Sequence, residues 1–202
     1  MLGIGNDLVS GGTYDRNDFR LSFDGTNDKC TLGNVLNFGT ADFSISFWVN
    51  LPLDTGDWVR LITKIQNTDN GVFAWLDSAG VKALFQYKAG GNTVATGAGA
   101  ASMAPLANTW IHICGTADRD GNFATYVNGT TATYGKTAAD MSNDSQNLDN
   151  TGTWEFMAHG SDYYAGYMTD VALYNVALSS THVNEIFNGG SPFDLTLHSQ
   201  SS

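Results

Sequence analysis

The carboxylates of this 202-residue sequence are the side chains best suited to chemistry, and their distribution argues against hydrolysis. Among 20 acidic residues, only Glu155 and Glu185 are glutamates. Glycoside hydrolysis needs two carboxyl groups about 5–10 Å apart that flank the scissile bond. Glu155 stands alone between Trp154 and Phe156, and Glu185 falls in a predicted helix. Motifs for serine hydrolases, phosphate loops, zinc peptidases and paired CxxC sites are also absent. We therefore predict a protein that is not an enzyme, with a hydrolase of unrelated mechanism as the one enzymatic alternative.

Oxygen ligands are concentrated in the polar segment 136–152. It contains Asp140, Asp144 and Asp149 together with asparagine and glutamine, and has hardly any apolar residue. Carboxylate, amide and carbonyl oxygens are the ligands that Ca²⁺ takes. Long loops at one end of a sandwich commonly carry binding surfaces. We expect this segment to be such a loop, with ligand or calcium binding as its candidate role.

Three aromatic residues are candidates for stacking on the faces of sugar rings. They are Trp58, Tyr163 and Tyr164. Tryptophan and tyrosine combine a large apolar face with a polar edge, which suits them to carbohydrate recognition. The two tyrosines could equally pack at an interface with another chain, and the sequence leaves both roles open.

The two cysteines offer a disulfide or a nucleophile, and we expect neither. Cys30 and Cys114 both fall in strand-like segments. His112 shares a strand face with Cys114, but such pairs are common in cores, so packing is favoured over a catalytic Cys–His pair. A disulfide between the cysteines remains an alternative. Two reduced, buried cysteines are the expected state in a protein that is assembled inside a cell.

The clearest structural pattern is the alternation of apolar and polar residues at 42–51. A period of two indicates a strand with one buried face, and five large apolar residues on that face require a second layer to cover them. The Asp24-Gly25 pair just upstream predicts a hairpin that leads into this strand. The apolar members of the alternation are Phe43, Ile45, Phe47, Val49 and Leu51.

Further short strands separated by turn residues complete the pattern of an antiparallel sandwich. Asp120-Gly121 and Asn128-Gly129 favour tight hairpin turns. Ser179 or Ser180 could cap a short helix that runs to Phe187 and ends at Gly189-Gly190. The small-residue segment 89–105 is either a flexible loop or a flat strand. The other predicted strands cover 58–65, 71–76, 81–88, 110–116, 123–127, 130–134, 154–158 and 166–174.

The order of several motifs resembles that of the laminin-G-like, or concanavalin A-like, jelly-roll domains over residues 20–190. The resemblance implies an all-β, two-sheet jelly roll with one short C-terminal helix. We therefore expect an arm or edge segment at 1–20, one domain at 21–190 and a tail at 191–202. The motifs are Phe23-Asp24-Gly25 with Asp28, Thr31-Leu32-Gly33, Phe43 to Val49, Trp110 to Ile113, Tyr126 to Gly129 and Gly166 to Ser179.

This resemblance also implies a structural calcium site. Many relatives hold Ca²⁺ between the N-terminal Asp-Gly turn and acidic residues ahead of the last core strand. Asp24 and Asp28 match the turn, and Asp170 matches one of the later acids, but Thr169 stands where the other acid is expected. The alternative is that the turn aspartates bind their own backbone in an Asx turn.

The charge balance excludes some partners. The net charge is −11, with 9 basic and 20 acidic residues. We expect no nucleic acid and no anionic membrane as partner, because both are bound through lysine and arginine. The N-terminus has no secretory signal pattern, so we expect assembly in the cytoplasm, or an extracellular location if the protein is a lectin.

Two functions from different classes fit these observations. The favoured one is a structural subunit of a virion surface, such as a phage decoration or cement protein or a tail-fibre component, that forms a homo-oligomer or binds other virion proteins. It is favoured by the initiator Met, the missing signal, the expectation that the chain ends contact other chains, and the resemblance of acidic jelly rolls to virion proteins. The alternative is a calcium-dependent, carbohydrate-binding adhesion module.

Overall fold

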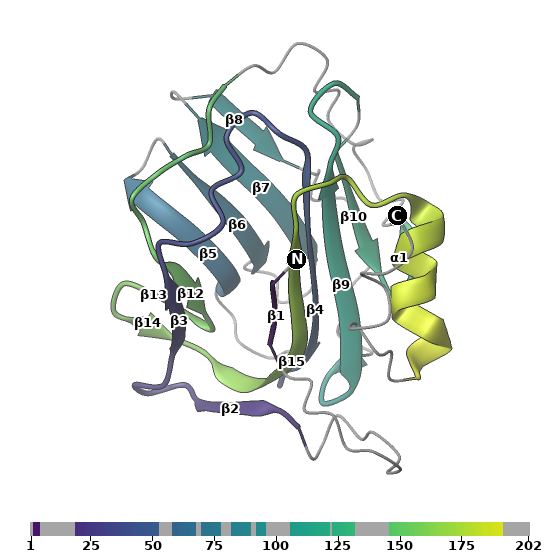
Figure 1. Ribbon diagram of the computed structural model, residues 1–202. Helices are drawn as coiled ribbons and strands as arrows, with labels where there is room; N and C mark the ends of the chain where they lie inside the picture. The colour runs from purple at the N-terminus through teal and green to yellow at the C-terminus, as the bar shows by residue number, and fades with distance from the viewer. Residues whose placement is uncertain are drawn as a thin grey trace.

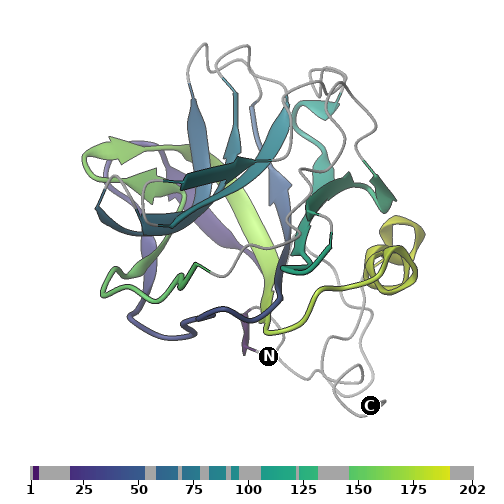
Figure 2. The same cartoon turned by 90° about the horizontal axis from the view of Figure 1, so that it is seen from above.

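Two antiparallel β-sheets pack face to face, and one helix lies outside them (Figures 1 and 2). This architecture confirms the predicted two-sheet sandwich. It is seen in a computed structural model that describes residues 2–4, 19–52, 58–67, 70–77, 82–89, 92–95, 106–121, 123–131 and 146–191.

The first sheet, called sheet A, has the order β1-β15-β4-β9-β10-β11, and β2 also pairs with β15. The strands β1 and β2 lie one after the other along the same edge of β15, because Ile4 pairs with Val171 and Leu21 pairs with Met168. The N-terminal residues 2–4 thus form an edge strand of sheet A. The bounds are β1 Leu2–Ile4, β2 Leu21–Asp24, β4 Phe43–Asn50, β9 Trp110–Ala117, β10 Phe123–Val127, β11 Thr130–Thr131 and β15 Ala165–Tyr174.

The second sheet, called sheet B, has the order β3-β12-β5-β6-β7-β8. Part of the small-residue segment forms its edge strand β8, and the rest of that segment lies outside the described residues. A separate two-stranded hairpin, β13 (Ala158–His159) with β14 (Asp162–Tyr163), follows β12. The bounds in sheet B are β3 Cys30–Gly33, β5 Val59–Asn67, β6 Asn70–Leu76, β7 Ala83–Ala89, β8 Asn92–Ala95 and β12 Trp154–Phe156.

The predicted hairpin at Asp24-Gly25 is wrong. β2 pairs with β15 in sheet A, whereas β3 pairs with β12 in sheet B. The turn therefore carries the chain from one sheet to the other. An Asp-Gly pair specifies a sharp reversal with a positive φ, here 75° at Gly25, but it does not specify that the flanking strands bond to each other.

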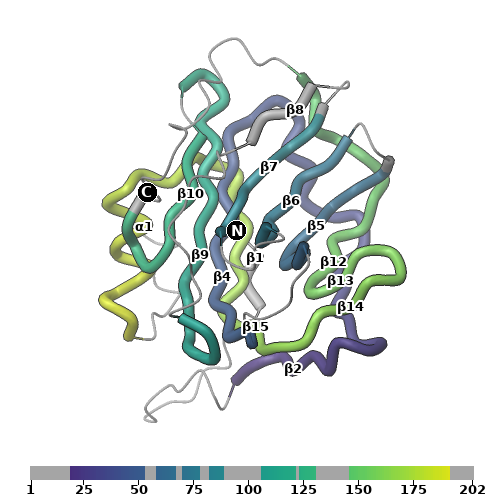
Figure 3. Tube along the Cα trace, turned by 180° about the vertical axis from the view of Figure 1, so that it is seen from behind, coloured from purple at the N-terminus to yellow at the C-terminus, as the bar shows by residue number. Residues whose placement is uncertain are grey.

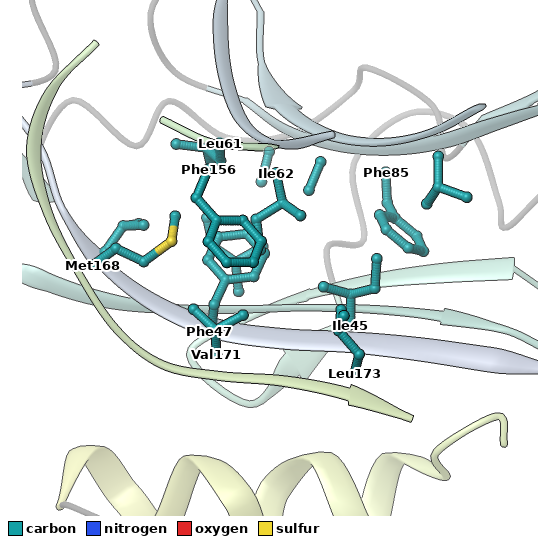
Figure 4. Packing of buried hydrophobic residues seen from close by; sticks show 14 of the residues in the cluster. Ile45, Phe47, Leu61, Ile62, Phe85, Phe156, Met168, Val171 and Leu173 are labelled. Atoms are coloured by element: carbon teal, nitrogen blue, oxygen red, sulfur yellow. The ribbon is translucent and has the colours of Figure 1, made fainter. Parts of the chain in front are cut away.

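The main core fills the space between the sheets (Figure 4). Phe47 from sheet A and Phe156 from sheet B are both buried there. A side chain at Gly115 of β9 would lie 2.2 Å from the ring of Phe85, so the missing Cβ lets this ring from the opposite sheet pack against the backbone. Burying each such side chain stabilises the fold by about 1.5–3 kcal/mol.

The short helix α1 (Ser180–Phe187) begins and ends as the sequence predicts. Ser179 is its N-cap, and the Ser179 Oγ accepts a hydrogen bond from the His182 N–H at 3.2 Å. Asn188, in the left-handed conformation with φ 48°, ends it, and the 3₁₀ turn η2 (Asn188–Gly190) follows.

Helix α1 covers the outer face of sheet A, so β4 is buried on both faces rather than on one. The polar face of the alternation, with Ser44, Ser46 and Trp48, is as buried as the apolar face. Trp48 stacks on Phe187 of the helix with ring centroids 5.8 Å apart. A second apolar cluster lies under the helix and consists of Cys114, Tyr126, Ala172, Tyr174, Leu178, Val183 and Ile186.

Candidate functional site

A cavity of about 520 Å³ opens where β4 ends and β5 begins. Much of its wall comes from the turn at the end of β2, the segment that leaves β4, and residues 161–165 around the end of β14. Val59 and Leu76, which pair between β5 and β6, line it from sheet B. The volume lies within the range of about 300–1,000 Å³ that is typical of ligand pockets. We call this feature the end pocket.

The hairpin β13–β14 places both candidate tyrosines on the wall of the end pocket. The Met157 N–H donates to the Leu61 carbonyl at 2.9 Å, and the Tyr164 N–H donates to the Met157 carbonyl at 3.0 Å. These bonds hold the hairpin beside β5, as Figure 3 shows. Tyr163 and Tyr164 are half-buried, so each ring combines a fixed position with an accessible part.

Tyr164 connects the end pocket to a group of side chains on sheet B. Burial raises the pKa of Tyr164, and the Arg60 side chain, which lies close to the Tyr164 hydroxyl, lowers it. The Arg60 guanidinium lies 5.8 Å from the centre of the Trp75 ring. Trp75 in turn stacks on Trp58, with centroids 4.4 Å apart and an interplanar angle of 24°. The candidate Trp58 is therefore joined to Tyr164 through two intervening side chains.

Asp24 also lines the end pocket, but its carboxylate stabilises the turn at the end of β2. Its Oδ1 accepts hydrogen bonds from the backbone N–H groups of Thr26 at 2.7 Å and Asn27 at 3.2 Å. The Asp28 Oδ2 accepts one from the Asp24 N–H at 3.1 Å. The bonds from Thr26 and Asn27 lower the pKa of Asp24. This is the geometry of an Asx turn.

The residues implied for calcium do not fit one metal site. Asp24 pairs with Ala165, while Asp170 lies five residues further along β15, roughly 16 Å away at 3.3 Å per residue. Asp170 is buried at a bulge with φ 50°, and the adjacent Thr169 hydroxyl donates to the Phe19 carbonyl at 2.6 Å. Within the described ranges, no three His, Cys, Asp or Glu residues form a group that could hold a metal ion.

The polar segment is a separate region. Asp140 and Asp144 lie outside the described residues. The Asp149 Oδ1 accepts a hydrogen bond from the Gly39 N–H at 2.7 Å, so Asp149 holds the connection between β3 and β4 rather than the end pocket. Nearby, the buried Lys64 ammonium donates to the Val35 carbonyl at 3.0 Å and to the Asn37 Oδ1 at 2.6 Å. Burial lowers the pKa of Lys64, and Asp149 opposes this shift.

The remaining polar candidates do not meet. Glu155 lies on β12 in sheet B and forms an ion pair with Lys29 at 2.8 Å, whereas Glu185 lies on α1. Cys30 belongs to sheet B, and Cys114 lies under α1, where burial raises its pKa.

The candidate Cys–His pair does not form either. The His112 Nε2 lies 2.8 Å from the Ser46 Oγ, so the serine is the partner of this imidazole.

Arg60 and Trp75 were not singled out by the sequence. Trp75 falls in a short strand, where an aromatic residue usually indicates core. Only the pairing of Arg60 with Trp75 between β5 and β6 brings the two together, and no local pattern contains that register.

A comparison with protein families matches residues 24–184 to the model of the concanavalin A-like lectin/glucanases superfamily. The chain belongs to this superfamily. The match covers most of the 202 residues and agrees with the resemblance seen in the motifs. No curated protein matches the chain.

Several solved structures share the fold of this superfamily member. The binding domain of Paraclostridial Mosquitocidal Protein 1 matches with a TM-score of 0.65 and 20% identity over 85% of this chain and 43% of that one. The Botulinum neurotoxin serotype D binding domain matches with a TM-score of 0.67 and 15% identity over 94% and 46%. The serotype G binding domain matches with 0.64 and 18% over 91% and 45%. The chain thus spans less than half of these structures, and at such identities the likeness concerns the fold.

No helix in the described part of the chain has the length and apolar character needed to cross a membrane.

Proposed function

We propose that this protein is a non-enzymatic interaction module that binds carbohydrate in the end pocket. The observation that carries the proposal is the joining of Tyr163 and Tyr164 with Asp24, Thr26 and Ser161 around one cavity. Aromatic rings can stack on the apolar faces of sugars, while hydroxyl and carboxylate oxygens can bind their hydroxyl groups. The similar structures from Paraclostridial Mosquitocidal Protein 1 and Botulinum neurotoxin serotype D are binding domains, which supports a binding role in general terms.

The charges of the end pocket favour a neutral sugar. Asp24 and Asp162 both line it, and the whole chain carries a net charge of −11. An acidic sugar would be repelled by these carboxylates. Catalysis is disfavoured by the same residues, because a general acid needs a raised pKa, whereas backbone hydrogen bonds lower the pKa of Asp24.

Binding in the end pocket is proposed to be independent of calcium. Asp24 already accepts two backbone hydrogen bonds, and Asp170 lies too far along β15 to share an ion with it. We therefore propose a pocket that recognises sugar through protein groups alone, and the calcium-dependent lectin is the alternative that the comparison with and without EDTA tests.

A glycan array with the full chain tests this function. We expect binding to neutral glycans that EDTA does not change and that Tyr163→Ala or Tyr164→Ala reduces at least about tenfold. Tyr167→Ala is the matched control, because Tyr167 is also a half-buried tyrosine but packs under Arg20, 4.2 Å from its guanidinium, and does not line the pocket. Absence of binding to every neutral glycan would contradict the proposal.

The virion-subunit hypothesis is the second proposal, and it rests on the sequence. The tail at 192–202 and most of the N-terminal arm lie outside the described residues, while residues 2–4 pair with β15 of the same chain. Light scattering with and without EDTA tests this hypothesis. A stable dimer or trimer would support a self-assembling subunit, and a monomer would leave the binding module as the better explanation.

A further inference from the structure

A stacked pair of tryptophans on the outer face of sheet B adjoins the end pocket. Val59 and Leu76 are core residues that pair with each other, and the next pair in register is Arg60 with Trp75. Since successive residues of a strand point to opposite faces, Arg60 and Trp75 lie on the outer face. Trp58 stacks on Trp75 there, at 4.4 Å between ring centres.

Trp58 is exposed to an unusual degree. Its exposed fraction is 37%, and among the described residues only Val35 and Val176 are comparably exposed large apolar side chains. Trp58 is therefore the one aromatic residue of the described ranges that presents such an area to solvent. An exposed aromatic face of this kind commonly marks a place where a partner binds.

Arg60 makes the tryptophan pair continuous with the end pocket. Its guanidinium lies over the Trp75 ring, and its side chain also lies close to the hydroxyl of Tyr164, which lines the pocket. His159 of the same hairpin lies close enough to Arg60 to be affected by its charge. A ligand that fills the pocket and extends past Tyr164 would reach Arg60 and then the tryptophans.

We propose that Trp58 and Trp75 form a second subsite, which binds the continuation of a neutral oligosaccharide whose end occupies the end pocket. This inference rests on the proposed carbohydrate binding. A protein partner fits the surface less well, because a stable interface buries about 800 Å² on each side and one exposed tryptophan supplies only a small part of that area. An indole face matches the size and the apolar C–H face of one sugar ring.

The subsite predicts that affinity depends on the length of the sugar chain. The probes are glucose, mannose, galactose and N-acetylglucosamine and their linear oligomers of two to six units, measured by calorimetry with the full chain. We expect the affinity of wild-type protein to rise with length in one of these series. Trp58→Ala should remove the gain, a loss of roughly 3- to 10-fold for the longer oligomers, and leave binding of the shortest ligand unchanged.

Two further variants keep the test interpretable. Trp75→Phe keeps an aromatic residue on the outer face of the strand but provides a smaller surface on which Trp58 stacks, so it should weaken the length dependence without unfolding the protein. Val176→Ala is the matched control, since it truncates an exposed apolar side chain in the segment between β15 and α1. Thermal melting checks that each variant is folded.

The outcomes separate the two proposals. Equal affinity for short and long oligomers, or a length gain that survives Trp58→Ala, would overturn the second subsite and leave sugar binding in the end pocket intact. Failure of wild-type protein to bind any member of the series would overturn the proposed function and this inference with it.

Discussion

The two outer faces of the sandwich differ sharply in what covers them. On sheet A, helix α1 buries a second apolar cluster, and β4 has no exposed face. On sheet B, the corresponding outer face leaves Trp58 exposed and stacked on Trp75 near the end pocket. The comparison shows that alternation along a strand tells which residues share a face, but not whether that face meets water, a helix or a ligand.

Two buried serines of the covered face have hydrogen-bond partners. The Ser44 Oγ donates to the Val176 carbonyl and accepts from the Leu178 N–H, both at 2.9 Å. Ser46 bonds with His112 at 2.8 Å. These serines therefore stabilise the approach of the helix and are not surface residues. On the outer face of sheet B, the part around Trp58, which we call the open face, leaves that side chain 37% exposed, which is consistent with a surface that exchanges water for a ligand.

The largest expected effect on stability comes from weakening the packing of α1 on sheet A. Ile186 of α1 is only 2% exposed where the helix packs on sheet A, so Ile186→Ala should lower the free energy of unfolding by about 2–5 kcal/mol. Trp58→Ala on the open face should cost less, about 0.5–1.5 kcal/mol, because the ring is partly exposed but stacks on Trp75. Urea unfolding followed by far-UV circular dichroism measures both. Equal losses for the two variants would show that the faces do not differ in the way described.

The turn between β10 and β11 offers the next test of the covered face. Gly129 has φ 72°, and a Cβ there would lie 2.6 Å from the Asn184 Oδ1 and 2.7 Å from the Phe187 ring. Gly129→Ala should cost about 3 kcal/mol, because backbone strain adds to displacement of α1. Gly160→Ala is the matched control, since Gly160 has φ 63° with no atom within 4 Å of its Cβ position.

The control isolates the contribution of helix packing. Gly160→Ala should cost about 1–2 kcal/mol from the left-handed conformation alone. If thermal denaturation gives the same loss for both alanine variants, the close contact between this turn and α1 is not present in solution.

Much of the fold follows from local patterns in the sequence. The spacing of Phe43 to Val49, the cap at Ser179 and the turn at Asn128-Gly129 each depend on residues a few positions apart. Strand partners depend on the whole chain, which is why the turn at Asp24 was mistaken for a hairpin. The burial of Ser46 under α1 was missed for the same reason, because a serine in an alternating strand usually faces solvent.

Part of the candidate site could likewise be predicted from the sequence, and part could not. Tyr163 and Tyr164 were identified because tyrosine combines a large apolar face with a polar edge, and the structure places both on the end pocket. Arg60 and Trp75 could not be identified, since their meeting depends on the register between β5 and β6. The calcium hypothesis placed Asp170 next to the turn at Asp24 because the motifs occur in the order seen in the family. The strand pairing along β15 instead separates the two aspartates.

A smaller loss of stability is expected from the buried hydrogen bond under α1. Ser46→Ala removes the partner of His112 Nε2 and should cost about 1–2 kcal/mol, because an imidazole nitrogen is left buried in that position. Ser161→Ala, at an exposed position on the rim of the end pocket, should be neutral within about 0.5 kcal/mol. Chemical denaturation distinguishes the two, and a neutral Ser46→Ala would mean that water reaches His112.

The smallest expected effect is a pH dependence of stability that arises from His159. Burial, together with the charge of Arg60, lowers the pKa of His159 from its usual 6.5. Between the folded pKa and 6.5, the unfolded chain binds more protons, so this residue makes stability rise with pH in that window. Its contribution is fully present above 6.5 and is lost as the pH falls through the folded value.

NMR titration of the His159 ring tests whether the Arg60 side chain lies beside the β13–β14 hairpin. We expect a midpoint below 6.5 in the wild-type protein. Arg60→Gln should raise that midpoint, since the repulsion is removed, but not restore it fully because burial remains. A midpoint that Arg60→Gln leaves unchanged would place Arg60 away from the hairpin, and the connection from Tyr164 to the tryptophan pair would then be broken.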